Sequence, residues 1–308
     1  MFGTIKQIYE LFSNFAVMND LKLQTPVEAG KSIFPISVKD RIMVLGSCFA
    51  DNIGSRMEDI GMDVCVNPFG TLYNPVSVCN SIARLSSGVP FSESECVEMG
   101  AGAGLVCSFN HHTSFARKTT EEFLQYANEE FAKASEFWKT ATKVIVTLGT
   151  AWCFEYTRSG EIVSNCLKID AKEFTRRRLG VREVSMILRN MVGRNPQKEF
   201  VFTVSPIRHM KDGAHGNQLS KSTLLLALED VCAAYPERVS YFPAYEIVLD
   251  ELRDYRFYAE DMVHPSDQTV GYLWKRFVDF AVPEAERGEI EEREKAFRRS
   301  QHRPLHKA

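Results

Sequence analysis

Five short apolar runs constrain the fold of this chain more than any other feature. Each run is rich in β-branched or aromatic residues and is followed by a turn residue, and the runs span residues 41–45, 63–66, 143–148, 200–204 and 239–242. Their apolar character is continuous rather than alternating, which is typical of strands buried on both faces of a sheet. The sequence therefore predicts five buried strands.

Helical stretches separate and follow these runs. The apolar spacing predicts helices over residues 50–60, 120–140, 185–192, 220–235, 245–254 and 267–282. Strands that alternate with helices favour a mostly parallel sheet with helices on both faces, so the expected fold class is α/β. Ligands of such sheets bind beyond the carboxyl ends of the strands, which is where the polar turn residues of these runs fall.

The same pattern predicts one folded domain with two extensions. Residues 22–283 carry the alternation of strands and helices, and residues 87–117 within them read as a long loop or insertion. Residues 1–21 are an N-terminal arm with the apolar spacing of a short amphipathic helix, and Met18 is a second possible start. Residues 284–308 are a charged C-terminal tail, expected to be an exposed helix followed by a frayed end.

Charge and hydropathy argue against two classes of partner. The net charge of the 308-residue chain is −3, whereas proteins that bind phosphate backbones usually carry a basic excess, so nucleic acid is not an expected partner. No apolar run approaches the roughly 20 residues of a membrane span. The first residues do not resemble a secretory signal, so a cytoplasmic location is expected. The oligomeric state does not follow from the sequence.

The cysteines are expected to be reduced and mostly buried, because no secretory signal points to an oxidising compartment. None of them has the spacing of zinc ligands: Cys48, Cys65, Cys79, Cys96, Cys107, Cys153, Cys166 and Cys232. We therefore expect neither a disulfide framework nor a metal site, and no cofactor.

A serine stands at the carboxyl end of the first predicted strand. Gly46 permits a sharp turn after Leu45, and a helix is expected to begin near Cys48. Ser47 in this turn is well placed to act as a nucleophile, with the first N–H groups of the helix available to stabilise an oxyanion. Two alternatives stay open, since Ser47 can instead cap the helix and the thiol of Cys48 can be the nucleophile.

An acidic residue and a histidine stand three positions apart before the last predicted helix of the domain. Asp261 can hold the Nδ1–H of His264, and His264 can then accept the proton of a serine hydroxyl. The alternative is a polar loop in which Ser266 or Asp267 caps the following helix. The order of Ser47 followed by this pair strengthens the catalytic interpretation.

Several sequence blocks resemble the GSCFA family, a bacterial family that is similar to SGNH/GDSL-type hydrolases. The resemblance covers residues 22–283 and is carried by GSCFA, NPFGTLYNP, TLGTAWCFEY, TVSPIRHMKDG and ELRDYRFYAEDMVHPSD, at residues 46–50, 67–75, 147–156, 203–213 and 251–267. It implies a three-layer α/β/α sandwich with a five-stranded flavodoxin-like sheet. It also implies a catalytic triad of Ser47, Asp261 and His264.

The resemblance further implies an oxyanion hole with one departure from the SGNH pattern. The N–H groups of Ser47 and Gly70 are two expected donors. The asparagine that follows the third strand in SGNH-type hydrolases is missing, because Ala151 occupies its place. Candidate substitutes are Thr150, the Gly149 backbone, and the side chains of Asn67 or Asn74. One such donor is typically worth about 10²–10³ in rate.

Other polar residues are candidates for the substrate side of the site. His111 and His112 either line it or clasp a polar loop, and Trp152 follows the third strand. Arg208 and His209 follow the fourth strand. Arg208 can bind a carboxylate or phosphate of the substrate, or it can pair with an acidic neighbour such as Asp212. The arginines at 176–178 are expected in a solvated turn rather than against an acidic polymer.

These expectations converge on a serine esterase that cleaves a small acyl ester, with an acetyl group on a carbohydrate as the example. An acyltransferase that uses the same acyl-enzyme is a second hypothesis, with the segment 87–117 as the acceptor groove. A non-catalytic domain that binds a sugar or protein ligand is the third, and the missing asparagine is its main support. The sequence does not decide among them.

Overall fold

The predicted strands form one parallel sheet in the computed structural model, which describes residues 24–301. The order across the sheet is β10-β9-β5-β1-β2. All five predictions are confirmed to within one residue, with bounds of Arg41–Gly46 for β1, Asp63–Val66 for β2, Lys143–Leu148 for β5, Glu199–Val204 for β9 and Val239–Tyr241 for β10. The predicted N-terminal arm and residues 302–308 lie outside the described residues.

The order of the strands is that of a flavodoxin-like sheet. Counted along the chain these strands lie in the order 2-1-3-4-5, so the direction of winding reverses between β1 and β5. These two strands run in register with Gly46 opposite Thr147 at their carboxyl ends. Crevices for ligands form at such a reversal, which places Ser47 at the expected point.

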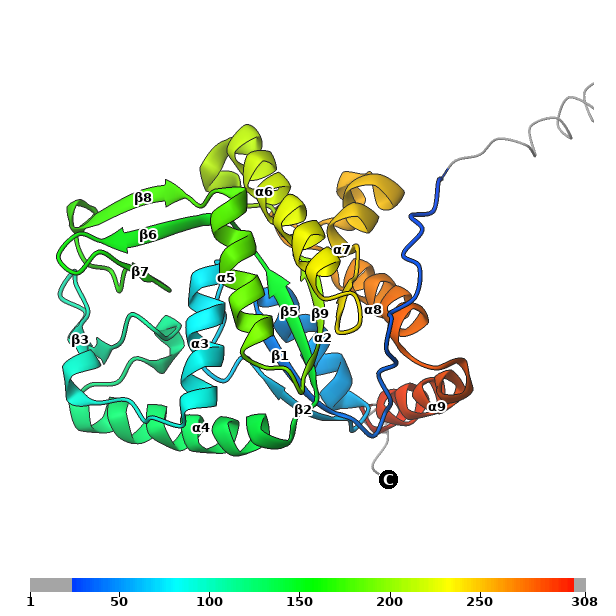
Figure 1. The fold of residues 1–308 in the computed structure, drawn as a ribbon, viewed down its shortest axis with the longest axis horizontal. Coiled ribbons are helices and arrows are strands. Elements are labelled where there is room, and N and C mark those ends of the chain that lie inside the picture. The colour runs from blue at the N-terminus through cyan, green and yellow to red at the C-terminus, as the bar shows by residue number, and fades with distance from the viewer. Residues whose placement is uncertain (1–23, 302–308) are drawn as a thin grey trace, which may run out of the picture.

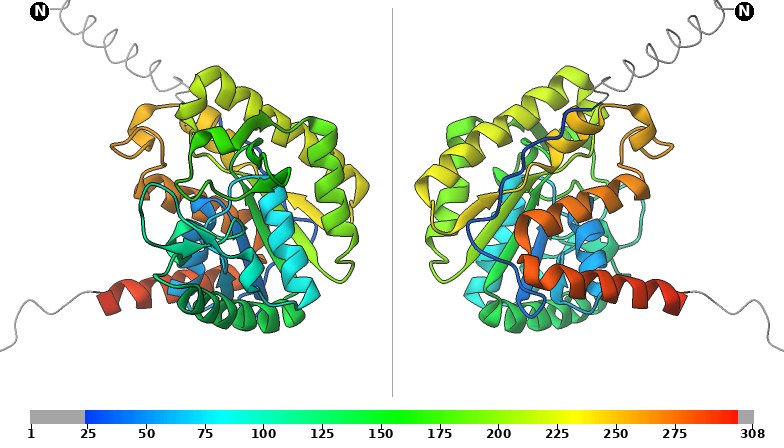
Figure 2. Two further views of the ribbon diagram at one scale, coloured as in Figure 1. Left: turned by 90° about the vertical axis from the view of Figure 1, so that its left-hand side faces the viewer. Right: turned by 90° about the vertical axis from the view of Figure 1, so that its right-hand side faces the viewer.

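Helices cover both faces of the sheet, which confirms the three-layer α/β/α architecture (Figures 1 and 2). One apolar core lies under α2 (Cys48–Asp59) and α8 (Asp267–Ala281). The other lies under α3 (Pro75–Ser87), α4 (Thr120–Thr140), α5 (Val181–Gly193) and α6 (Gly213–Ala234). Residues of β1 alternate between the two cores, because successive side chains of a strand point to opposite faces.

Helices α5 and α6 begin at Val181 and Gly213, before the predicted starts at 185 and 220, and two other helical regions differ more. The helix α3 was not predicted, although Asn74 caps it, Pro75 starts it and Gly88 ends it in the left-handed conformation. The helix predicted over 245–254 is shorter, since α7 (Ala244–Glu246) continues as a π-helical turn, η6 (Ile247–Leu252).

Antiparallel strands form outside the main sheet. A three-stranded sheet contains β6 (Trp152–Tyr156), β7 (Glu161–Val163) and β8 (Phe174–Arg178). The solvated turn predicted for 176–178 is therefore wrong, because these arginines belong to β8, where Arg176 and Arg177 pair with acidic side chains and Arg178 donates to Thr223. The segment 87–117 is not only a loop, since it holds the short pair β3 (Val97–Glu98) and β4 (Val106–Cys107).

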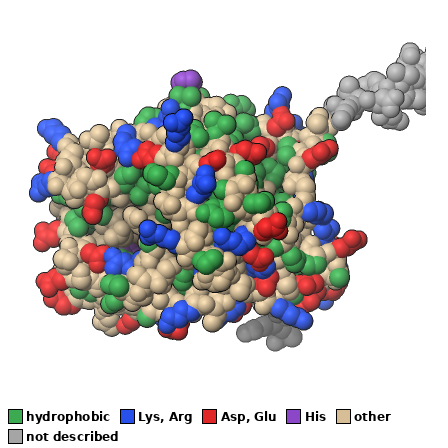
Figure 3. Space-filling model, viewed as in Figure 1, with side chains coloured by type: hydrophobic (Ala, Val, Ile, Leu, Met, Phe, Trp, Pro, Cys, Tyr) green, Lys and Arg blue, Asp and Glu red, His purple; other side chains and the backbone are tan. Residues whose placement is uncertain are grey.

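The charged tail begins with the predicted helix, α9 (Glu284–Gln301). It packs on the core through the buried Ile290, and Glu294 accepts the indole N–H of Trp274 at 2.6 Å. On the face shown in Figure 3, basic and acidic side chains are interspersed. Within residues 24–301, no helix has the length and apolarity to span a membrane.

Candidate functional site

The sharp turn after β1 positions Ser47. Gly46 has a φ of 131°, a conformation that favours glycine, and a Cβ at this position would collide with the carbonyl oxygen of Thr147. The close approach of the two backbones is fixed by Ser47 N–H, which donates to that carbonyl at 3.0 Å. The turn thus fastens the start of α2 to the end of β5.

The hydroxyl of Ser47 has partners within this turn. Its Oγ lies 3.1 Å from Thr147 Oγ1 and accepts the N–H of Phe49 at 3.3 Å, so the predicted capping role is confirmed. Ser47 and Thr147 are both fully buried. The hydrogen bonds of Ser47 Oγ therefore go to Thr147 and Phe49, while the hydrogen-bond partner of the His264 ring is Asp261.

The predicted acid–histidine pair is formed by one tight loop. Asp261 Oδ2 lies 2.6 Å from His264 Nδ1, and Asp261 Oδ1 accepts the N–H groups of Val263 and His264 at 2.8 and 2.9 Å. These hydrogen bonds, with that of the histidine ring as the largest cause, lower the pKa of Asp261 to about 2. The carboxylate stays charged near neutral pH and favours the His264 tautomer with Nδ1 protonated, which leaves Nε2 able to accept a proton.

Arg208 anchors this loop to the segment that follows β9. Its backbone N–H donates to Val263 O at 3.0 Å, and its Nη1 donates to Met262 O at 2.8 Å. Met262 has a φ of 57°, so the loop holds a residue in the left-handed region, which L side chains rarely adopt. The contacts of Arg208 and Asp261 stabilise that conformation and fix the position of His264.

His209 connects the loop to the turn beyond β2. Its ring packs edge-on against Tyr73, with 6.1 Å between the centroids. Burial, followed by the nearby positive charges of Lys221 and His264, lowers the pKa of His209 to about 3. His209 is therefore neutral near pH 7, and its Nε2 is buried without a hydrogen-bond partner among the described residues.

The expected oxyanion donors already have acceptors. Ser47 N–H donates to Thr147 O, Gly70 N–H donates to Asn67 O at 2.7 Å, and Thr150 N–H donates to Tyr73 O at 3.0 Å. Gly149 N–H shares the Tyr73 acceptor, and Thr150 Oγ1 bonds to Ser220 Oγ at 2.9 Å. The assignment of these N–H groups as free donors is therefore not supported by this conformation. The N–H of Cys48, at the first position of α2, has no acceptor within the helix.

Both candidate asparagines have structural roles. Asn67 accepts the Gly46 N–H through Oδ1 at 2.8 Å and donates from Nδ2 to Asp51 at 2.6 Å. It thereby joins the ends of β1 and β2 to the first turn of α2. Asn74 caps α3 by accepting the Ser77 N–H at 2.9 Å. Their side chains hold the backbone rather than face an open site.

The predicted substrate-side histidines separate in the structure. His111 is fully buried, with its ring 4.4 Å from that of Phe91 and its Nδ1 at 2.7 Å from Ser108 Oγ. Its burial and its contact with Ser108 fit the alternative of a loop clasp rather than a residue that lines the substrate side, and burial lowers its pKa to about 3. His112 is half-buried and packs on Gly70, where a Cβ would collide with it.

Trp152 lies at the start of β6, half-buried, and donates its indole N–H to Gly216 O at 3.3 Å. The guanidinium of Arg176 lies 4.9 Å from its ring centroid, and Arg176 also pairs with Asp212. Asp212 is thus the partner of Arg176, not of Arg208 as one alternative held.

Comparison with known proteins gives one decisive match. The profile of the GSCFA family matches residues 41–277, which is most of the chain. The chain belongs to the GSCFA family. None of the curated proteins matches it. A solved structure, described only as "Crystal structure of", is similar at 21% identity and a TM-score of 0.28. That similarity covers 45% of this chain and 63% of the other chain.

Tyr73 belongs to the site of this GSCFA protein, although the sequence analysis did not select it. Its hydroxyl lies 3.4 Å from Cys48 Sγ and 3.3 Å from Thr71 Oγ1. Burial, followed by the contact with Cys48, raises the pKa of Tyr73 to about 12, so the phenol is protonated near neutral pH. Its place in the block NPFGTLYNP was the available signal, because that block follows β2 at the reversal of the sheet.

Lys221 was also missed. It is fully buried in α6 and donates from Nζ to Gly149 O and Ser205 O, both at 2.7 Å. These carbonyls follow β5 and β9, so the ammonium ties together two loops at the carboxyl edge of the GSCFA sheet. Burial lowers the pKa of Lys221 to about 7. The signal in the sequence was its place three and seven residues before Leu224 and Leu228, which puts it on the apolar face of the helix.

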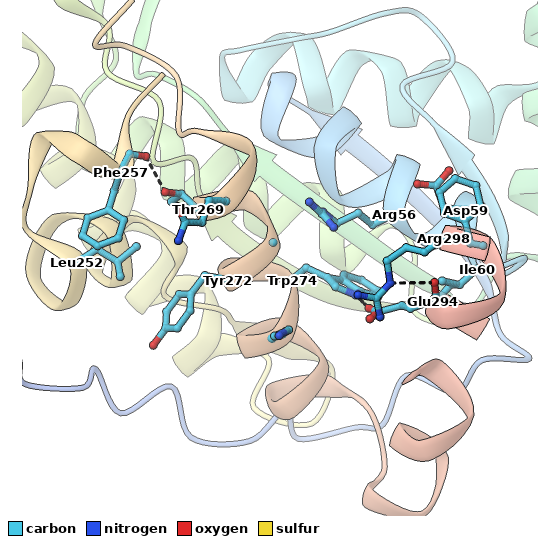
Figure 4. A pocket seen from close by; sticks show the side chains of 14 residues that line it. Arg56, Asp59, Ile60, Leu252, Phe257, Thr269, Tyr272, Trp274, Glu294 and Arg298 are labelled. Carbon is cyan, nitrogen blue, oxygen red and sulfur yellow. Dashed lines mark hydrogen bonds between the residues drawn. The ribbon is translucent and has the colours of Figure 1, made fainter. Parts of the chain in front are cut away.

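The GSCFA protein also has a cavity of about 640 Å³ away from these residues. It lies between α2, α8 and α9, and Figure 4 shows Leu252 and Phe257 at one end with Asp59 and Arg298 at the other. None of the predicted site residues lines it. Among residues 24–301, no three His, Cys, Asp or Glu side chains gather in a way that suits a metal ion.

Proposed function

We propose that this GSCFA protein is a serine hydrolase that cleaves a small acyl ester, with Ser47 as nucleophile, His264 as base and Asp261 as its orienting carboxylate. The observation that carries the proposal is the Asp261–His264 pair. Its 2.6 Å contact, together with two backbone N–H groups on the other carboxylate oxygen, fixes the histidine ring in one tautomer. A histidine ring held in one tautomer with Nε2 unprotonated is what a general base requires.

The place of Ser47 supports the same role. It begins α2 at the point where the winding of the sheet reverses, and the dipole of that helix favours negative charge near its first turn. In the proposed reaction, Ser47 Oγ bonds to the ester carbonyl carbon as His264 Nε2 takes its proton. The Cys48 N–H, free of an intrahelical acceptor, is the proposed oxyanion donor.

The remaining steps return the enzyme to its starting state. The C–O bond to the alcohol breaks, and the alcohol leaves with the proton from His264. Water then attacks the acyl carbon, gives a proton to His264, and the acid departs as Ser47 Oγ recovers that proton. Asp261 stays ionised throughout and stabilises the imidazolium.

The buried state of Ser47 sets a requirement for this proposal. Substrate reaches Oγ only after the hydroxyl turns away from Thr147 and the residues that cover it move. The neighbouring Tyr73 is held by backbone as well as side-chain contacts, because its carbonyl accepts the N–H groups of Gly149 and Thr150 at 2.9 and 3.0 Å.

Hydrolysis of short-chain p-nitrophenyl esters tests the proposal. We expect turnover by the wild type and loss of at least about 10³-fold in kcat for Ser47→Ala, because no other group supplies the nucleophile. Cys48→Ala is the matched control, since it removes the neighbouring thiol and leaves the Ser47 hydroxyl in place. Equal rates for wild type and Ser47→Ala would overturn the assignment.

A further inference from the structure

A small cavity adjoins the loop that carries His264. Its volume is about 220 Å³, and its lining consists of the polar and aromatic side chains Arg208, Arg253, Asp254, Tyr255 and Tyr258 and two aliphatic side chains of η6, Val248 and Leu249. The cavity therefore has one wall with two arginines, one aspartate and two tyrosines, and one apolar wall. Arg208 is half-buried in it, whereas Tyr255 is 65% exposed at its rim.

Among residues 24–301, the charge of Arg208 has no carboxylate partner. The two other ionic groups of the lining are paired, since Arg253 contacts Asp250, and Asp254 contacts Arg256, which lies outside the lining, at 2.8 Å. The guanidinium of Arg208 uses one N–H for Met262 O. Its carbon lies 5.5 and 5.3 Å from the ring centroids of Tyr255 and Tyr258, so aromatic rings hold it without neutralising it.

The cavity and His264 share a short stretch of backbone. Tyr258 pairs with Pro265 in an isolated β-bridge, and the N–H of Ala259 donates to His264 O at 2.7 Å. Arg208 reaches the same loop from β9 through Val263 O. The cavity thus adjoins the loop that carries the proposed base, and its Arg208 belongs to the segment that follows β9.

We propose that the Arg208 cavity is a subsite for a compact anionic group, so that the preferred substrate is an ester whose acyl or alcohol part carries a carboxylate or phosphate. This inference rests on the proposed hydrolase function and narrows its substrate class. The chemistry fits, because a guanidinium presents several N–H donors in a planar fork that matches the oxygens of either anion. The tyrosine hydroxyls at the rim add neutral donors.

Paired substrates test the inference through turnover. The p-nitrophenyl monoester of glutarate and p-nitrophenyl pentanoate have acyl chains of equal length, and only the first ends in a carboxylate. We expect wild-type kcat/KM to favour the glutarate ester by about tenfold to a hundredfold, as a charge-assisted hydrogen bond provides. Arg208→Gln should lose that preference, measured as the ratio of kcat/KM for the two esters, which does not depend on how far the loss of the contact with Met262 O lowers both rates.

Two variants separate recognition from the anchoring of the loop. Arg208→Lys keeps the positive charge but loses the planar set of N–H donors, so it should keep part of the preference for the glutarate ester. Arg182→Gln on the exposed face of α5 changes the net charge equally and should keep all of it. Equal losses on both esters in Arg208→Gln would show that Arg208 only positions the loop, and would overturn the inference without touching the proposed hydrolysis.

Binding to a variant that cannot turn over removes the dependence on activity. Calorimetric titration of Ser47→Ala with glutarate, and separately with inorganic phosphate, should show saturable binding of at least one anion that the Ser47→Ala/Arg208→Gln protein lacks. The anion with the lower Kd identifies the substrate as a carboxylate or a phosphate. Failure of both to bind Ser47→Ala, or equal binding by the double variant, would overturn the inference even if wild type hydrolyses esters.

Discussion

Ser47 Oγ and Thr147 Oγ1 lie 3.1 Å apart at the carboxyl ends of neighbouring parallel strands, and both residues are fully buried. This contact stabilises the turn and also holds the proposed nucleophile away from the histidine. Removal of the contact should therefore lower the free energy of unfolding and raise the reactivity of Ser47.

Thr147→Val removes the hydroxyl and keeps the shape of the side chain. We expect the free energy of unfolding to fall by about 1 kcal/mol, the typical value of a buried neutral hydrogen bond, in urea denaturation. The rate at which a fluorophosphonate labels Ser47 should rise, since the Oγ no longer has to leave Thr147. Thr147→Ser retains the hydroxyl and is the control. Slower labelling of the valine variant would contradict this account of the contact.

The turn at Gly46 should tolerate no side chain. A Cβ there would meet the backbone of Thr147, and φ is 131°, so Gly46→Ala is expected to cost more than about 3 kcal/mol of stability. Gly61→Ala isolates the cost of the left-handed backbone conformation, because Gly61 has a φ of 72° and open space around it. This variant should lose only about 1–2 kcal/mol of stability. Similar thermal unfolding of the two variants would show that Gly46 is not a close-approach position.

The main sheet followed from the sequence because its signal is local. Short continuous apolar runs that end at turn residues are typical of buried strands. The helix at 120–140 likewise shows its apolar spacing and both its ends in the sequence. The antiparallel layer was missed because β8 is FTRRR, whose arginines are paired with residues distant in the sequence. Helix α3 was not predicted because serines interrupt its apolar face, although its capping residues, Asn74 and Gly88, are typical ones.

The candidate site was predictable in its residues but not in its hydrogen bonds. Ser47 was selected by its place at the end of a strand, and Asp261 and His264 were selected by their spacing of three before the last predicted helix, a spacing from which their contact follows. That the Thr150 N–H already has an acceptor depends on how loops from different strands meet, because Tyr73 O follows β2 whereas Thr150 follows β5. His111 was misread for the same reason, since only the fold reveals the aromatic residues that enclose it.

Asp261→Asn should leave the loop folded and impair the base. An amide cannot stabilise an imidazolium and favours the wrong tautomer of His264, so we expect kcat to fall by about 10³–10⁴-fold. The loss should be present from pH 5 to 8, because the wild-type carboxylate, with a pKa of about 2, is ionised across that range. Circular dichroism checks the fold, and a loss below tenfold in steady-state assays would argue against the triad.

The same carboxylate should affect acid stability. Its pKa is depressed from 3.8, so the stabilisation it contributes is complete above about pH 4 and is lost as the pH falls toward 2. Relative to Asp261→Asn, the wild type should therefore lose stability only in that acid window, which urea denaturation at pH 2.5 and 5 would measure. An equal difference at both pH values would contradict the depressed pKa.

Lys221 should make the stability of the protein depend on pH above about 7. Its pKa falls from 10.5 to about 7 on folding, so the unfolded chain binds more protons between these values and stability rises with pH there. Lys221→Met lacks this rise and leaves Gly149 O and Ser205 O unpaired, at a cost of about 2 kcal/mol. Urea denaturation should show that the difference in free energy of unfolding between wild type and Lys221→Met is larger at pH 9.5 than at pH 7. The exposed Lys139→Met is the control. A difference that is smaller at pH 9.5 would contradict the lowered pKa of Lys221.

The central claim is that His264 activates the hydroxyl of Ser47. Mass spectrometry of the protein after treatment with a fluorophosphonate tests it most directly, because the adduct identifies the reactive side chain. The account predicts an adduct on Ser47 in wild type and in Cys48→Ala, and its loss in His264→Ala. Absence of the adduct from Ser47 in the wild type, or its undiminished formation in His264→Ala, would contradict the account.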